Sequence, residues 1–206
     1  MLSFLCNDPI IWSETENEAL NARVFQFATK MKDSITYCIE NRRSNKDTIE
    51  IGYRYSKKAE YAAARWLHEK GDYPFLEPDM EVVSAENKNW DPDLIYDPLD
   101  KDSSGFHVKS CSCDTRFIAY DYSWTFQTAN SNGPGGKDAI FYSKKDEWVI
   151  LVYATTWTIN KYVIMGLVDF QEVKSVLCDP NKDSLVGLRL CLNYENIRRL
   201  GAEVLS

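Results

Sequence analysis

The sequence has little of what several common classes of protein need. It contains only two histidines, and its six cysteines include just one close pair, Cys111 and Cys113. Because a structural zinc site takes four Cys or His ligands at recurring short spacings, no zinc centre is expected. No apolar run in the sequence approaches the ~20 residues that a membrane-spanning helix requires. A membrane protein is therefore not expected either.

Positive charge is also scarce. The chain has 24 Lys and Arg against 31 Asp and Glu, which gives a formal net charge of −7. Proteins that coat nucleic acid without sequence preference have a basic balance instead, so this class is disfavoured. The charge does not exclude an enzyme that acts on nucleic acid, because a metal site needs carboxylates and basic groups can be concentrated on one face.

The first residues lack the features of a secretory signal. Residues 1–12 contain Asp8 and Pro9 and have no basic start, whereas a signal peptide begins with positive charge followed by an apolar stretch. The cysteine spacing also shows no disulfide framework. We therefore expect reduced cysteines and a cytoplasmic protein.

Length and composition favour one soluble α/β domain. The chain has 206 residues, of which 44% are hydrophobic and 27% charged, values typical of a globular protein with one core. We expect a single domain over residues 1–206, with a helical N-terminal extension over residues 1–50.

Two segments have the pattern of helices. Residues 13–37 have apolar positions at helical spacing, and Ser13 with Glu16 forms a capping-box pattern at their start. Residues 56–70 form the clearest helix, with Ser56 as the expected cap and Gly71 as the expected end. The polar residues 41–47 are expected to form a loop between them.

The rest of the chain has the sequence pattern of short strands. Turn-rich stretches at 97–105 and 131–137 separate the apolar segments. A short helix is expected over residues 193–200. The expected strands are residues 80–83, 93–96, 106–110, 139–142, 148–155 and 162–169, whereas the state of the aromatic segment 118–126 is left open.

Two of these strands carry polar residues in a pattern that points to chemistry. Asp93 begins one strand, and His107 and Lys109 lie on the next. Side chains alternate along a strand, so His107 and Lys109 share a face and Val108 points the other way. A turn between the strands would place Asp93 beside the His107 and Lys109 pair.

These residue types suit the hydrolysis of a phosphodiester. That reaction needs a divalent cation to neutralise developing charge, an activated water and a fixed phosphate. Asp93 supplies a hard oxygen ligand for Mg²⁺, and the backbone carbonyl of Val108 is a second candidate ligand. Lys109 is suited to orienting the attacking water or stabilising the phosphate. Glu60, on the preceding helix, is a further candidate ligand for the metal.

The pattern resembles the PD-(D/E)XK nuclease superfamily, in its restriction-endonuclease-like and resolvase-like branches. Pro92-Asp93 matches the PD element, and His107-Val108-Lys109 stands at the (D/E)-x-K element. The helix with Glu60 resembles the helix that donates a glutamate in the resolvase-like branch. The resemblance covers about residues 52–127 and implies a central mixed β-sheet flanked by helices, dependence on Mg²⁺ or Mn²⁺, and cleavage of DNA.

His107 departs from the pattern of this superfamily, which usually has a carboxylate there. A neutral imidazole can bind a divalent ion, but it is a softer ligand and brings no negative charge. Three outcomes stay open: His107 binds metal and favours Mn²⁺, Glu60 replaces the missing carboxylate, or the site is inactive. In the last case the protein would be a nuclease fold that only binds nucleic acid or protein.

Further residues complete the expected site. The superfamily often has a polar residue after the lysine strand, for which Gln127 is the candidate, with Asp138 on weaker grounds. Arg54, Lys57 and Lys58 are candidates for binding the nucleic-acid backbone. DNA is the expected substrate and RNA is an alternative. The resemblance fits a stand-alone enzyme of a bacterial cell or a phage-infected host by analogy, and it leaves open whether the protein forms a homodimer.

Overall fold

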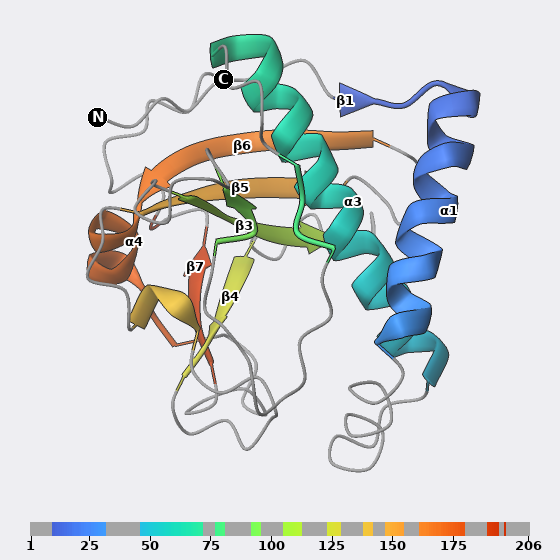
Figure 1. Cartoon of the computed structure of the whole chain (residues 1–206). Helices are drawn as coiled ribbons and strands as arrows, with labels where there is room; N and C mark the ends of the chain where they lie inside the picture. The colour runs from blue at the N-terminus through green and yellow to red at the C-terminus, as the bar shows by residue number, and fades with distance from the viewer. Residues whose placement is uncertain are drawn as a thin grey trace.

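A five-stranded mixed sheet lies at the centre of the protein in this computed structural model (Figure 1). Only β3 and β5 run parallel, and the other neighbouring strands are antiparallel. Sheet and helices together confirm the mixed α/β class. The strands, in their order across the sheet, are β1 (Ile10–Ile11), β6 (Lys161–Asp169), β5 (Trp148–Ala154), β3 (Gly105–Ser112) and β2 (Leu94–Ile95).

The structure describes part of the chain, and some predictions lie outside that part. These are the turn over residues 97–104, the glycine-rich loop 131–137 and the ends of several predicted elements. The described residues are 10–31, 46–71, 77–80, 92–95, 105–112, 123–128, 138–141, 147–154, 161–179, 189–193 and 196.

The middle strands form where the sequence is most apolar. β5 is a run of Trp, Val, Ile, Leu and Tyr residues, and all of it except Trp148 is buried. Such a run suits a central strand, because both of its faces are covered. The strands predicted at 106–110, 148–155 and 162–169 are confirmed as β3, β5 and β6.

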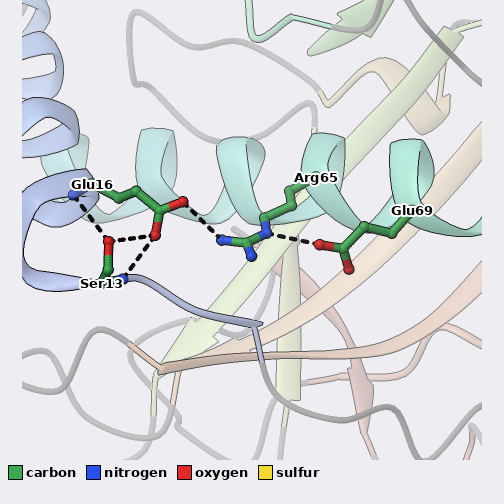
Figure 2. Close-up of polar contacts among 4 residues, drawn as sticks. All are labelled: Ser13, Glu16, Arg65 and Glu69. Atoms are coloured by element: carbon green, nitrogen blue, oxygen red, sulfur yellow. Dashed lines mark hydrogen bonds and ion pairs between the residues drawn. The ribbon is translucent and has the colours of Figure 1, made fainter.

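The first helix, α1 (Glu14–Lys30), begins at the predicted capping box. The Ser13 amide donates to Glu16 Oε2 at 2.9 Å, and the Glu16 amide donates to Ser13 Oγ at 3.3 Å. Figure 2 shows that Glu16 also reaches Arg65 on α3 (Lys46–Gly71), with a nitrogen-to-oxygen distance of 3.6 Å. Arg65 in turn bonds Glu69 at 2.9 Å. The cap therefore also links the start of α1 to α3.

Helix α3 is longer than the sequence pattern predicts. It begins at Lys46, so the predicted loop at 41–47 and the predicted cap at Ser56 are wrong where the structure describes them. Ser56 lies inside the helix, and its hydroxyl donates to the Tyr53 carbonyl at 3.1 Å. A serine that bonds back to the preceding turn in this way fits inside a helix without starting it. The last helical residue is Gly71, as predicted.

Two apolar cores cover the two faces of the sheet. Alternation along β5 places Ile150 and Val152 in one core and Val149 and Leu151 in the other. Helix α3 covers the first face, with α1 beside it (Figure 1). The second face is covered by β4 (Ser123–Gln127) paired with β7 (Arg189–Asn193), by the short 3-10 helix η3 (Ala139–Phe141) and by α4 (Phe170–Val176).

Several predicted elements differ from the structure. Residues 139–141 form η3 instead of a strand, because the Phe141 amide bonds back to the Asp138 carbonyl at 3.0 Å. β4 and β7 pair with each other, and the pattern had assigned neither. Asn193 ends β7, so the helix predicted at 193–200 does not begin there, whereas Asn196, the other described residue of that range, is helical as predicted.

The N-terminal and edge segments also differ from the prediction. Ile10 and Ile11 form a strand that pairs with β6, so residues 1–50 are not only helical. Pro78 forms an isolated bridge to Leu94, just before the strand predicted at 80–83. Of that predicted strand, Met80 is not in a strand and residues 81–83 lie outside the described part. Among the described helices, none is long and apolar enough to cross a membrane.

Gly105 is predicted to be essential where β3 begins. A methyl group at this position would overlap Cβ and Cγ of the Pro92 ring, whose backbone is rigid. We expect Gly105→Ala to lower the free energy of unfolding by on the order of 2 kcal/mol in urea denaturation.

The matched control is Gly52→Ala on α3, where nothing lies within 4 Å of the added methyl. That change is expected to raise the free energy of unfolding by about 0.5–1 kcal/mol, since alanine favours a helix. Equal stability of the two alanine variants would contradict the contact between Pro92 and Gly105.

Candidate functional site

The Asp93 carboxylate is fixed to β3 at the edge of the sheet. Asp93 directly precedes β2, and its Oδ2 accepts a hydrogen bond from the Val108 amide at 2.7 Å. The β2–β3 ladder ends with Leu94 opposite Phe106. Beyond that pair the Val108 amide donates to the Asp93 side chain instead of to a backbone carbonyl of β2. The N–H and C=O of one residue face the same neighbouring strand. The Val108 carbonyl therefore points to the same edge of β3 as its amide.

Glu60 is buried on the face of α3 that packs on the sheet. The residue is 6% exposed and lies next to Ala59 in the first core. Lys57, one turn earlier on the helix, places its Nζ 2.7 Å from Glu60 Oε2. The same ammonium also donates to the Asp79 carbonyl at 2.5 Å and lies 4.7 Å from the centre of the Phe27 ring. The buried Lys57 ammonium therefore lies directly beside the Glu60 carboxyl.

Asp79 is a third acidic residue of this region, and the sequence pattern did not single it out. Its amide donates to the Asp93 carbonyl at 3.2 Å, next to the bridge between Pro78 and Leu94. The segment that contains Asp79 therefore lies along the outer edge of β2. The available signal was a second Pro-Asp dipeptide, since Pro78-Asp79 repeats Pro92-Asp93.

The electrostatics of the region centre on Glu60. The pKa of this carboxyl is raised to about 8. Burial is the largest cause and the negative charge of Asp93 the next, Lys57 opposes both, and Asp79 adds a smaller increase. At neutral pH the Glu60 carboxyl therefore mostly holds a proton. Burial is the first reason for this retained proton, and the nearby charge of Asp93 is the second.

His107 lies on the opposite face of the sheet from Glu60. Its Nε2 is 3.4 Å from Glu147 Oε2, and both side chains are buried. Its ring centre is 4.7 Å from that of Phe170, at the start of α4. Val108 packs in the core beneath α3 instead. The predicted alternation of His107 and Val108 is thus confirmed, and it separates His107 from Glu60, two residues that the sequence had placed in one ligand set.

Lys109 shares the face of His107 and forms an ion pair with Asp138. Its Nζ lies 2.7 and 2.8 Å from the two carboxylate oxygens of Asp138, and 5.4 Å from the centre of the Phe126 ring. Gln127 joins this group through its backbone, since its amide donates to Asp138 Oδ2 at 3.2 Å and its carbonyl accepts from the Asp138 amide at 2.9 Å. The structure thus brings together Lys109, Gln127 and Asp138.

Two of the three residues predicted to bind nucleic acid are buried. Lys57 and Lys58 are 9% and 5% exposed, which removes them from the surface that a phosphate backbone would contact. The Lys58 ammonium donates to Asn17 on α1 at 3.2 Å, and burial followed by the charge of Arg54 lowers its pKa. Arg54 is only partly buried and lies over the Phe25 ring at 5.7 Å.

The donor set for a metal ion is incomplete as it stands. In the part of the chain that the structure describes, no group of three or more His, Cys, Asp and Glu side chains is arranged to hold a metal ion. Asp93 and Glu60 are nevertheless hard oxygen donors of the kind that Mg²⁺ and Mn²⁺ prefer, and the Val108 carbonyl faces the same side as Asp93. The chemistry of these donors, as distinct from their arrangement, suits a divalent ion once Glu60 has lost its proton.

Comparisons with known proteins do not identify a family for this chain. No family model matches the chain, and neither the curated proteins nor the solved structures include a significant match. A functional assignment therefore depends on the residues and their geometry.

The protonation of Glu60 predicts how stability changes with pH. The pKa is raised in the folded state, from 4.5 to about 8, so the folded protein binds this proton more tightly than the unfolded chain does. The resulting stabilisation is fully present below pH 4.5 and is lost as the pH rises to about 8. Between these values the free energy of unfolding is expected to fall with rising pH.

Urea denaturation across this pH range measures the slope. Glu60→Gln should flatten it, because glutamine cannot release the proton. Glu69→Gln, an exposed position on the same helix, should leave it unchanged. A Glu60→Gln variant with the parent slope would show that another group causes it.

Proposed function

We propose that this protein is a nuclease that depends on Mg²⁺ or Mn²⁺ and hydrolyses phosphodiester bonds in DNA, on a restriction-endonuclease-like fold. Asp93 and Glu60 are its metal-binding carboxylates, and the Val108 carbonyl is a third oxygen donor. Lys109 acts on the attacking water or the phosphate.

The observation that carries this proposal is the state of Glu60. Its carboxyl is buried beside the charges of Asp93 and Asp79, and its pKa is about 8. A proton on such a group neutralises part of the negative charge, which is also what a divalent cation does. Binding of the cation would therefore displace the proton, as occurs at metal sites whose ligands must be deprotonated.

The other residues have roles that follow from their positions. The Val108 amide holds Asp93 Oδ2 at 2.7 Å, so the carboxylate has a fixed orientation and one oxygen left for a ligand. A bound divalent ion would supply charge neutralisation and lower the pKa of a bound water. Lys109 is the exception: it follows Val108 on β3 but, like His107, lies on the face away from α3, in an ion pair with Asp138. Its proposed action on the water or the phosphate therefore follows from the motif and not from its position.

His107 has no place among the metal ligands of this proposal. It contacts Glu147 across a buried distance of 3.4 Å on the face away from α3. This contact lies between strand β3 and the residue that precedes β5. Glu60 therefore replaces the carboxylate that usually stands at the position of His107.

The fold supports the proposal at a coarser level. The resemblance implies a mixed sheet flanked by helices, and here the helix with Glu60 covers the sheet that contains Asp93 at its edge. The order of the elements along the chain is also that of the motif, since α3 precedes β2 and β3.

One observation favours a second candidate, an inactive nuclease fold that binds nucleic acid or protein. The Lys57 ammonium is 2.7 Å from Glu60 and already supplies a positive charge beside the carboxyl. If that charge is permanent, it takes the place of a metal ion. The protein would then bind a partner without cleaving it.

Cleavage of plasmid DNA by the purified protein tests the proposal. We expect cutting with Mg²⁺ or Mn²⁺ and none with EDTA. Asp93→Asn and Glu60→Gln keep the side-chain shape but remove the charge, and each should reduce the rate by at least about 100-fold. Lys109→Met should have an effect of similar size.

The controls match the Glu60 and Lys109 variants in residue type and lie on exposed positions: Glu69→Gln on α3 and Lys174→Met on α4. Both should cut at the parent rate. Retained cleavage by Asp93→Asn would contradict the proposal. Binding of DNA without any cutting, measured by gel shift, would favour the second candidate, and a preference for RNA over DNA would revise the substrate.

A further inference from the structure

Two cysteines face each other across an isolated bridge behind the sheet. Cys178 follows α4, Cys191 lies in β7, and they are 13 positions apart in the sequence. Their backbones exchange both hydrogen bonds, at 3.0 Å from the Cys178 amide and 2.8 Å from the Cys191 amide. The two residues are therefore held directly opposite each other.

The thiols lie within reach of a covalent bond. The two Sγ atoms are 3.6 Å apart. Residues that form a hydrogen-bonded antiparallel pair have Cα atoms about 5.5 Å apart, within the range that disulfides span. Bond formation requires the sulfurs to approach to the bonding distance of about 2.05 Å.

We propose that Cys178 and Cys191 form a redox-sensitive thiol pair that closes to a disulfide when the protein meets a peroxide. The pair lies apart from Asp93 and Glu60, in the layer on the other face of the sheet, so the inference does not depend on the nuclease assignment.

The reaction takes place in two balanced steps. Cys178 is partly exposed, and its thiolate, after losing a proton to water, attacks the peroxide to give a sulfenic acid and an alcohol or water. The Cys191 sulfur then attacks the sulfenic sulfur, which forms the disulfide and releases one water molecule. The two thiols are oxidised and the peroxide is reduced.

Neighbouring groups hold the pair in its reduced arrangement. The Asn193 side-chain amide donates to Cys178 Sγ at 3.6 Å, and the Cys191 thiol donates to the Asp179 carbonyl at 3.5 Å. Cys191 is 4% exposed, so an outside reagent meets Cys178 first. This asymmetry suits an attacked thiol and a resolving thiol.

The disulfide would add a covalent link between two elements that are now joined by hydrogen bonds and core packing. It would tie the segment after α4 to the β4–β7 sheet, and both pack in the core on the second face. Closing this loop restricts the unfolded chain, so the oxidised protein should melt at a higher temperature than the reduced protein.

Peptide mapping of the full chain after treatment with hydrogen peroxide tests the proposal. The sequence places Lys182 and Arg189 between the two cysteines, so trypsin separates them into peptides 175–182 and 190–198. We expect these peptides to be joined without reductant, with a mass lower by two hydrogen atoms, and to separate after treatment with dithiothreitol.

Cys178→Ser and Cys191→Ser should each abolish the joined peptide and the rise in melting temperature. Cys111→Ser, at a partly buried cysteine on β3, is the matched control and should retain both. Unjoined peptides after oxidation, or Cys178 recovered only as sulfinic or sulfonic acid, would overturn the proposal. So would a joined peptide that contains Cys111.

Discussion

The hydrogen bond from the Val108 amide to the Asp93 carboxylate is the contact on which the arrangement of the site depends. This 2.7 Å hydrogen bond joins the residue before β2 to β3, at the point where the short β2–β3 ladder ends. Asp93 is thereby held beside strand β3 and within the electrostatic reach of Glu60 on α3. The Pro92 ring against Gly105 fixes the same corner from the other side, since no side chain fits there.

Successive residues of strand β3 point to opposite faces of the sheet. Val108 packs beneath α3, whereas His107 and Lys109 point to the layer that contains α4 and β4. Each polar side chain on that second face has a carboxylate partner, Glu147 for His107 and Asp138 for Lys109. On the first face Glu60 has the charges of Asp93 and Asp79 near it as well as the Lys57 ammonium, and it keeps a proton at neutral pH. A divalent ion bound there would take the place of that proton.

Sequence patterns predicted the parts of the fold that depend on local signals. The Ser13–Glu16 cap and strands β3, β5 and β6 follow from spacing and apolar runs, and the structure confirms them. Elements that depend on distant partners were missed, such as β7, which exists because it pairs with β4.

In the candidate site, too, local signals were predicted and contacts with distant residues were not. Alternation correctly separated Val108 from His107, but it could not reveal that α3 covers the Val108 face and that Glu60 and His107 therefore lie apart. Asp79 was missed because its role comes from a bridge between Pro78 and Leu94, and Glu147 because its partner lies on another strand.

The exchange of the Glu60 proton for a divalent ion is tested by calorimetry of Mn²⁺ binding at pH 7 in two buffers with different enthalpies of ionisation. Binding is expected to release close to one proton, and Glu60→Gln is expected to abolish this release. Binding with no proton release, or the same release from Glu60→Gln, would contradict that exchange.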